Sequence, residues 1–296
     1  MSTSMPIAAA LRTANGPFLL LLPLFAVTVV FVIVPLAVFV IYSFMTSALF
    51  SVALPFTFEA YEAAVRSPLN QSLAWNSIAI GLMTAAITTV IGLAVAYWLR
   101  YRAGRLQLPV LFLVSASIFA SYLVRIYAWR TILGRNGLIN SGLVEAGLIG
   151  EPLEFLLYNW FSVVVALVHI FLPYVVLVLF AAFRPLTPDY LETAQDLGAT
   201  ALARWQRVIL PLMAAPTATA FLFVFILSAS DFVTPQLIGG TGGQLLGVQI
   251  QTNFKAIGNW PVGAATSILM LLFFLMCYGI MQFALRALKL DQIRWS

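Results

Sequence analysis

Residues 191–212 read LETAQDLGATALARWQRVILPL, a polar and charged stretch that lies between two long apolar runs. Residues 184–207 hold three basic and three acidic side chains, although only 8% of the whole chain is charged. Thr187 can cap the start of a helix, and Gly198 can end it, because the left-handed turn after a helix favours glycine. Thr200 can then cap a second helix. The stretch therefore predicts two helices, joined at a glycine, that lie in water at a membrane face.

The first of these two helices is predicted to be amphipathic. Leu191, Ala194 and Leu197 recur every third residue and predict one apolar side. Glu192 and Asp196 lie together on another side, because residues four apart are neighbours on a helix surface. Such a helix is suited to docking on a protein from the aqueous side, although an ordinary amphipathic surface loop would have the same pattern.

The layout resembles the signature of the membrane-spanning subunits, or permeases, of type I ATP-binding-cassette importers (the MetI-like superfamily). That signature reads roughly Glu-Ala-Ala, three residues, Gly, nine residues, Ile-x-Leu-Pro. This chain has Glu192-Thr193-Ala194, Gly198 and Ile209-Leu210-Pro211, so Thr193 replaces an alanine and no spacer precedes Leu210. The resemblance implies that residues 187–211 form a coupling segment that sits in a groove of a cytoplasmic ATPase. The residues implied in coupling are Glu192, Thr193, Ala194, Asp196, Gly198, Ala199, Arg204 and Pro211.

Composition indicates an integral membrane protein, since 62% of the residues are apolar and the mean hydropathy is +1.01. A spanning helix needs about 20 mainly apolar residues, and backbone groups in lipid must pair within the segment, which favours helices. A glycine-rich loop at 236–244 excludes a seventh span, and its glycines allow either insertion into a partner or plain flexibility. We expect an all-α protein with the type I importer permease fold and six spans, at 17–45, 74–98, 108–130, 158–182, 208–231 and 262–286.

The distribution of Lys and Arg predicts the orientation. With both termini in the cytoplasm, the inner segments hold ten basic residues and the outer segments five. We therefore expect a multi-pass protein of the bacterial inner membrane, and we attribute the net charge of +5 to topology rather than to nucleic-acid binding. The expected parts are residues 1–70 (tail, first span and outer loop), 71–286 (five-helix core) and 287–296 (cytoplasmic tail).

Catalytic and cofactor chemistry is missing from the sequence. No phosphate-binding loop of the G-x-x-x-x-G-K-[ST] type is present, and no glycine precedes a lysine anywhere. The chain is therefore expected to be no enzyme and to bind no cofactor, with ATP and magnesium held by a separate subunit. His169 is the only histidine and Cys277 the only cysteine, which argues against a metal site. His169 lies in the fourth predicted span, where it is either a packing residue or part of a proton relay.

Two further motifs resemble the spermidine/putrescine branch of these permeases, and especially the first of the two permeases of such systems. They are RIYAWRTILG at 125–134 and SDFVTPQLIGG at 230–240, and with the coupling segment the resemblance covers most of residues 70–285. The branch also includes carriers of other small nitrogenous solutes, such as opines and amino-acid derivatives. The implied partners are a second permease, two ATPase subunits, a periplasmic solute-binding protein and the lipid bilayer. The alternatives are an ion-driven carrier that acts alone and a membrane anchor that recruits an ATPase.

Asp231 is the candidate residue for contact with a cationic solute. It follows 23 uncharged residues, and a carboxylate in a bilayer is costly and usually lines a pathway or is paired. Tyr122, Trp129 and Phe232 are predicted at a similar depth, where aromatic faces attract organic ammonium groups. Alternatively, Asp231 lies at the level of the lipid headgroups within an interfacial aromatic belt. Arg125 either extends outward or pairs with Asp231.

Overall fold

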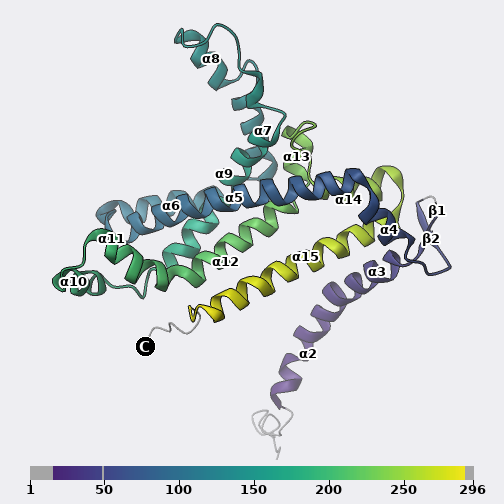
Figure 1. Cartoon of the computed structure of the whole chain (residues 1–296), viewed down its shortest axis with the longest axis horizontal. Coiled ribbons are helices and arrows are strands. Elements are labelled where there is room, and N and C mark those ends of the chain that lie inside the picture. Colours follow the sequence, from purple (N-terminus) through teal and green to yellow (C-terminus); the bar gives the residue numbers. More distant parts are fainter. Residues whose placement is uncertain (1–15, 49, 291–296) are drawn as a thin grey trace, which may run out of the picture. The chain divides into compact units, whose positions relative to one another are not determined.

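The structure is a computed structural model that describes residues 16–48 and 50–290. The N-terminal tail up to residue 15 and the end of the predicted C-terminal tail, residues 291–296, lie outside the described residues. The described chain is mainly helical (Figure 1). The α-helices are α2 (Gly16–Thr28), α3 (Val34–Ser43), α4 (Glu59–Arg66), α5 (Pro68–Tyr101), α6 (Gln107–Ile118), α7 (Tyr122–Leu133), α8 (Leu138–Glu145), α9 (Trp160–Ala182), α10 (Pro188–Asp196), α11 (Ala201–Arg204), α12 (Leu210–Ala229), α13 (Val233–Ile238), α14 (Leu246–Thr252) and α15 (Trp260–Ala287).

Short segments of other geometry complete the secondary structure. Strands β1 (Thr46–Ala48) and β2 (Ser51–Ala53) form an antiparallel hairpin in which Ser47 lies opposite Val52. The 3-10 and π-helical turns are η1 (Val29–Ile33), η2 (Gly104–Leu106), η3 (Glu154–Leu156), η4 (Trp205–Ile209) and η5 (Asn253–Ile257).

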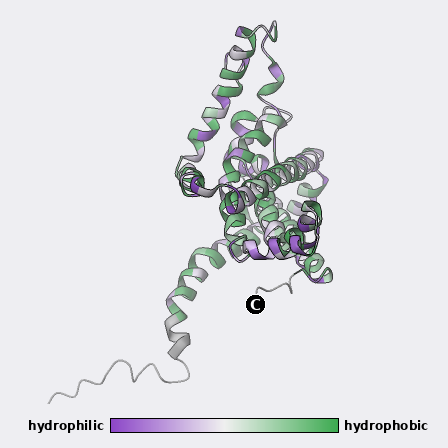
Figure 2. Ribbon diagram, turned by 90° about the vertical axis from the view of Figure 1, so that its left-hand side faces the viewer, coloured by the Kyte–Doolittle hydropathy of each residue, from purple (hydrophilic) through white to green (hydrophobic). Residues whose placement is uncertain are grey.

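Five helical segments of the described chain are long and apolar enough to cross a membrane, and hydrophobic residues dominate the long helices in Figure 2. A bent helix pair, Gly104–Ile118 with Tyr122–Glu145, makes a sixth span if it is counted as one. These segments overlap all six predicted spans, so the predicted all-α membrane architecture is confirmed. The five unbroken segments are Leu21–Ser43, Pro68–Tyr101, Trp160–Ala182, Ala201–Ala229 and Trp260–Ala287.

The third span differs from the prediction of one continuous helix over 108–130. The chain bends by 98° between α6 and α7. The last turn of α6 tightens, since Phe119 N–H donates to the Ala116 carbonyl at 3.1 Å, and the Ser117 hydroxyl donates to the Val114 carbonyl at 2.7 Å. Serine hydroxyls that bond back to the preceding turn compete with helical hydrogen bonds and bend helices. Ser121 then has an extended backbone (ψ 137°) and starts α7 in a new direction.

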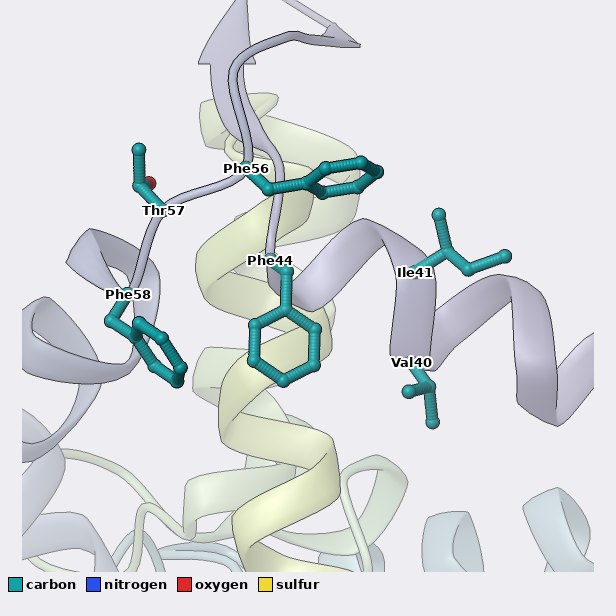
Figure 3. A pocket seen from close by; sticks show the side chains of 6 residues that line it. All are labelled: Val40, Ile41, Phe44, Phe56, Thr57 and Phe58. Carbon is teal, nitrogen blue, oxygen red and sulfur yellow. The ribbon is translucent and has the colours of Figure 1, made fainter.

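The described chain packs into two compact units, each with a core of its own. The first comprises the residues up to 64 and residues 253–269. In it, buried alanines of α4 meet Ala265 of α15, and the Tyr61 hydroxyl lies 2.8 Å from the buried Ser43 hydroxyl. The rings of Phe44 and Tyr61 are 5.2 Å apart. An apolar pocket of about 290 Å³, shown in Figure 3, is lined by Val40, Ile41, Phe44, Phe56, Thr57 and Phe58.

The second unit comprises residues 65–252 and the residues from 270 onward. Its centre is α5, which packs against α9 and α12. Gly92 of α5 lies directly against Val175 of α9, and a Cβ built on Gly81 would lie 2.9 Å from the Ala229 side chain of α12. Small residues at helix crossings let backbones approach closely in membranes. A large apolar core, including the fully buried Leu167, fills the unit.

The second unit has two ends that matter for function. At one, the C-terminal ends of α5 and α9 meet the N-terminal ends of α6 and α12, with α10 and α11 beside them (Figure 1). We call this the Arg100 end. At the other, α13 and α14 lie beside the N-terminal parts of α9 and α5, because the Ser162 hydroxyl donates to the Ile238 carbonyl at 2.6 Å and Leu246 N–H donates to the Ser77 hydroxyl at 2.9 Å. We call this the Asp231 end.

Candidate functional site

The predicted glycine joint of the coupling segment is present at the Arg100 end. Gly198 has φ +83°, the left-handed region that glycine adopts without strain. Ala199 N–H donates to the Ala194 carbonyl at 2.9 Å, and Gly198 N–H donates to the Gln195 carbonyl at 2.8 Å. This pair of hydrogen bonds satisfies the last carbonyls of a helix that ends in a glycine. The joint therefore fixes the direction in which the chain leaves α10.

The second helix begins as predicted, whereas the first begins differently. The Thr200 hydroxyl accepts from Ala203 N–H at 3.2 Å and caps α11. Thr187 precedes α10, but its hydroxyl donates to the Asp189 carboxylate at 3.3 Å and makes no cap bond to the backbone. Arg204 of α11 donates to the Gln195 side chain of α10 at 3.0 Å. This bond ties the two helices together across the joint.

The apolar side predicted for α10 is only partly buried. Leu191 is 8% exposed and packs into the core, but Leu197 is 83% exposed. The predicted apolar side ends before Leu197, because α10 ends at Asp196 and Leu197, the residue after it, has ψ 7°. Glu192 and Asp196 are exposed, as is Thr193. The surface of the segment thus presents the carboxylates of Glu192 and Asp196 together with the exposed side chain of Leu197.

The base of the coupling segment is held by the end of α5. The Tyr101 hydroxyl donates to the Leu186 carbonyl at 2.8 Å, and Arg100 donates to the carbonyls of Phe183 and Arg184 at 3.3 and 3.4 Å. Phe183 is fully buried. The helices α11 and α12 are joined through the π-helical turn η4, and Pro211 lies in the first turn of α12, where proline is tolerated. The ring of Trp205 in η4 lies 4.9 Å from that of Tyr97.

Asp231 and Tyr122 meet at the Asp231 end. The Tyr122 hydroxyl donates to Asp231 Oδ2 at 2.8 Å and lies 2.9 Å from the Thr234 hydroxyl. The carboxylate also accepts from Val233 N–H at Oδ1, 3.1 Å, and from Thr234 N–H at Oδ2, 3.2 Å. Asp231 therefore follows the end of α12, and its half-buried side chain accepts two backbone N–H groups from the first turn of α13; the bend before Tyr122 brings α7 to it.

Arg125 is not paired with Asp231. Its side chain is only 8% exposed, and Nη1 donates to the Ile170 carbonyl of α9 at 3.2 Å. Its Nε is buried and has no hydrogen-bond partner. Neither alternative in the sequence analysis describes it, since the guanidinium neither extends outward nor binds a carboxylate. Within residues 16–48 and 50–290, the charge of Arg125 is held against a helix carbonyl.

No hydrogen bond joins the side chains of the remaining predicted pathway residues, Trp129 and Phe232, to this group within the described chain. Trp129 of α7 packs edge-on against His169 of α9, with ring centroids 5.7 Å apart. Phe232 is 39% exposed between α12 and α13. The structure thus joins Tyr122 to Asp231 by contact, and it places Trp129 against a different helix. Among the described residues, no group of three or more His, Cys, Asp or Glu side chains could hold a metal ion.

The glycine-rich loop is folded rather than free along most of its length. Gly240 has φ +56° and lies against the Tyr158 carbonyl, and Gly243 lies against the backbone of Asn159. The Gln244 side chain donates to the Gly240 carbonyl at 2.8 Å. Gly242 alone has open space around it. Plain flexibility is therefore not the role of these glycines, because three of them make close backbone approaches.

Several residues of these sites were not singled out from the sequence. Thr234 is fully buried beside Asp231. Its position, a hydroxyl residue three places after an aspartate, is the sequence feature that could have indicated it. Tyr97 and Tyr101 lie four residues apart at the end of α5, which places them on one face of that helix. Asn140, 1% exposed, donates to the Leu153 carbonyl at 3.2 Å and accepts from Leu153 N–H at 2.8 Å. It closes the loop after α7, and nothing in the local pattern indicates that.

Comparison with known proteins gives matches over most of the chain. Residues 89–289 match the family described as "Binding-protein-dependent transport system inner membrane component". The spermidine/putrescine transport system permease protein PotB of Haemophilus influenzae is 31% identical over 246 residues, which are 83% of this chain and 85% of the relative. PotC, the permease protein of the same description from that organism, is 25% identical over 220 residues, 73% of this chain and 77% of PotC.

The fold has a counterpart among solved structures. A bacterial alginate ABC transporter, in complex with an alginate pentasaccharide-bound periplasmic protein, contains a chain that superposes with a TM-score of 0.77. The match covers 95% of this chain and 98% of that chain at 16% identity. At that identity the likeness concerns the fold alone.

Proposed function

Because the chain belongs to the family of inner membrane components of binding-protein-dependent transport systems, we propose that it forms part of the membrane pathway for polyamines such as spermidine and putrescine. Its membership makes it a permease subunit, a transport component rather than an enzyme, and a multi-pass protein of the inner membrane. The observation that carries the solute class is the match to the spermidine/putrescine permease over most of both chains.

We infer that the chain works with a second permease, two ATPase subunits and a periplasmic binding protein. A weaker match to a second permease of the same system supports the pairing of two related permeases. The importer of the same fold that is bound to a periplasmic protein supports the binding-protein partner. ATP and magnesium belong to the ATPase subunits in this proposal, because the sequence has no phosphate-binding loop.

The coupling segment is the proposed contact with the ATPase. Glu192, Asp196 and Leu197 are exposed on or beside α10 and are available to a partner. The glycine joint and the Arg204–Gln195 bond hold the two short helices as one piece. When ATP closes the ATPase dimer, this piece moves with it, and α5, α9 and α12 transmit the movement to the Asp231 end. Solute shifts the equilibrium between the inward-open and outward-open states only by the difference between its affinities for the two states.

Asp231 is the proposed contact for an ammonium group of the solute. A carboxylate has about four lone-pair sites, and three hydrogen bonds already occupy this one. Oδ2 accepts two of them and Oδ1 one, so a site on Oδ1 remains for a cationic N–H donor. Phe232, which follows Asp231 directly, exposes an aromatic face that suits an organic ammonium ion. An arginine paired with Asp231 would cancel the charge of the carboxylate. Arg125 does not pair with it, because its guanidinium is buried against α9.

Uptake of labelled spermidine and putrescine by cells with and without the chain tests the proposal. Cells that lack it are expected to lose uptake, and the wild-type chain should restore it. Uptake that is unchanged without the chain, while another small nitrogenous solute is lost, would reassign the solute and leave the permease role intact. Uptake driven by an ion gradient in vesicles that contain the chain alone would instead support a stand-alone carrier.

A further inference from the structure

A groove at the Arg100 end of the second unit has both basic and apolar walls. Its volume is about 540 Å³, and it lies where the ends of α5 and α9 meet the start of α6. Arg100, Arg184 and Gln107 line one part of it. The apolar part is formed by Leu108 and Leu111 of α6 and by Phe180 and Ala181 of α9.

The polar and apolar residues of the groove follow one another along α6 and α9. Gln107 begins α6, and Arg184 follows the last turn of α9, so both mark the edge of a spanning segment. Leu111 and Phe180 lie four residues further into their spans, which is about 6 Å along a helix axis. A ligand that fills the groove therefore meets charge at the membrane surface and hydrocarbon one turn deeper.

The basic wall carries positive charge that no carboxylate neutralises within the described chain. Arg100 and Arg184 line the groove, and no acidic residue among those described lines it. Arg100 uses Nε and Nη2 on the carbonyls of Phe183 and Arg184, which are neutral acceptors. A guanidinium has five N–H donors in a planar fork that matches the oxygens of a phosphate, so Arg100 retains donors for an anion. The Arg184 side chain is exposed beside it.

We propose that this groove binds an anionic phospholipid. The headgroup phosphate lies on Arg100 and Arg184, and the acyl chains start along Leu111 and Phe180 before they enter the bilayer. Basic pockets between membrane helices at the membrane surface bind anionic headgroups in this manner. The depth order of the walls favours a lipid over free phosphate, since free phosphate would leave the apolar part of the groove unfilled. The site is independent of which solute the importer carries.

Native mass spectrometry of the purified full chain, with the subunits that co-purify with it, tests the proposal. Phosphatidylglycerol and phosphatidylcholine are added at equal concentration, and the lipid molecules that remain bound are counted. The wild type is expected to retain phosphatidylglycerol in preference. Arg184→Gln should bind it about fivefold more weakly, the factor that corresponds to about 1 kcal/mol for one basic residue near a membrane surface. Arg184→Lys, which keeps the charge, should lose less.

Two matched variants distinguish lipid binding in the groove from general attraction of lipid to basic residues. Ala181→Trp keeps every charge but fills the groove, and it should reduce retention at least as much as Arg184→Gln. Arg102→Gln removes an exposed arginine of the same membrane face that does not line the groove, and it should leave retention near the wild-type level. Equal losses in Arg102→Gln and Arg184→Gln would overturn the proposal. So would full displacement of the lipid by excess inorganic phosphate, because the site would then take a free anion.

Discussion

Gly198 makes it possible to separate backbone strain from side-chain size in the coupling segment. Its φ is +83°, and a Cβ built on it meets no atom within 4 Å. A substitution therefore costs only what the left-handed backbone costs an L-residue, about 1–2 kcal/mol. That is a factor of about 5–30 in the equilibrium constant between the native turn and its alternatives. If the ATPase binds only the native turn, its apparent affinity should fall by up to that factor, in proportion to the fraction of native turn that is lost.

Gly198→Ala and Gly198→Leu are accordingly expected to weaken ATPase binding equally, despite their different sizes. Gly198→Asn should stay close to the wild type, because asparagine tolerates the left-handed region. The affinities are measured by immobilising the detergent-solubilised permease on a surface and titrating it with the purified ATPase. Gly147→Ala is the matched control, since Gly147 also has a positive φ (+69°) and open space but lies outside the segment. The reasoning fails if the asparagine variant binds as weakly as the alanine variant.

Three other changes test the remaining sites. Asp231→Asn should lower uptake of a cationic solute at least tenfold, because it removes the charge but keeps much of the hydrogen bonding; an equal loss in Tyr122→Phe would mean that their contact, rather than the charge, matters. In a background without the native cysteine, Leu202→Cys should react with impermeant thiol reagents only from the cytoplasmic side and Gly142→Cys only from outside, and reversed labelling would refute the predicted orientation. Tyr101→Phe should lower the free energy of unfolding by about 1 kcal/mol through one lost hydrogen bond, and an unchanged denaturation midpoint would contradict that anchor.

The elements that could be predicted from the sequence are those with local causes. The long apolar runs predicted the spans, and Gly198 and Thr200 predicted a joint and a cap within a few residues of chain. The bend at 119–121 was missed because it contains neither proline nor glycine; serine hydroxyls and a tightened helix end produce it. The predicted apolar side of the first helix was counted as far as Leu197, but α10 ends at Asp196, so the three-residue period extends one residue beyond the helix.

Contacts between distant segments could not be predicted in the same way. Tyr122 and Asp231 are 109 residues apart and meet only because α7 changes direction. Arg125 could be expected to find a partner, but a pattern of residue types cannot say that the partner is a backbone carbonyl of α9. The glycine-rich loop similarly owes its order to Tyr158 and Asn159, which lie on a different segment.

The coupling segment is also a separable module. Its shape comes from bonds within residues 194–204, and its attachment comes from a few contacts: Leu191 in the core, the Tyr101–Leu186 bond and the Tyr97–Trp205 ring pair. Exposed residues between these anchors are free to vary without disturbing α5, α9 or α12. If the segment is the ATPase contact, as proposed above, chimeras that exchange it between related permeases should change which ATPase a permease binds and leave its solute the same. On that proposal, a fold built in this way would let the same membrane helices work with a new ATPase or a new solute independently.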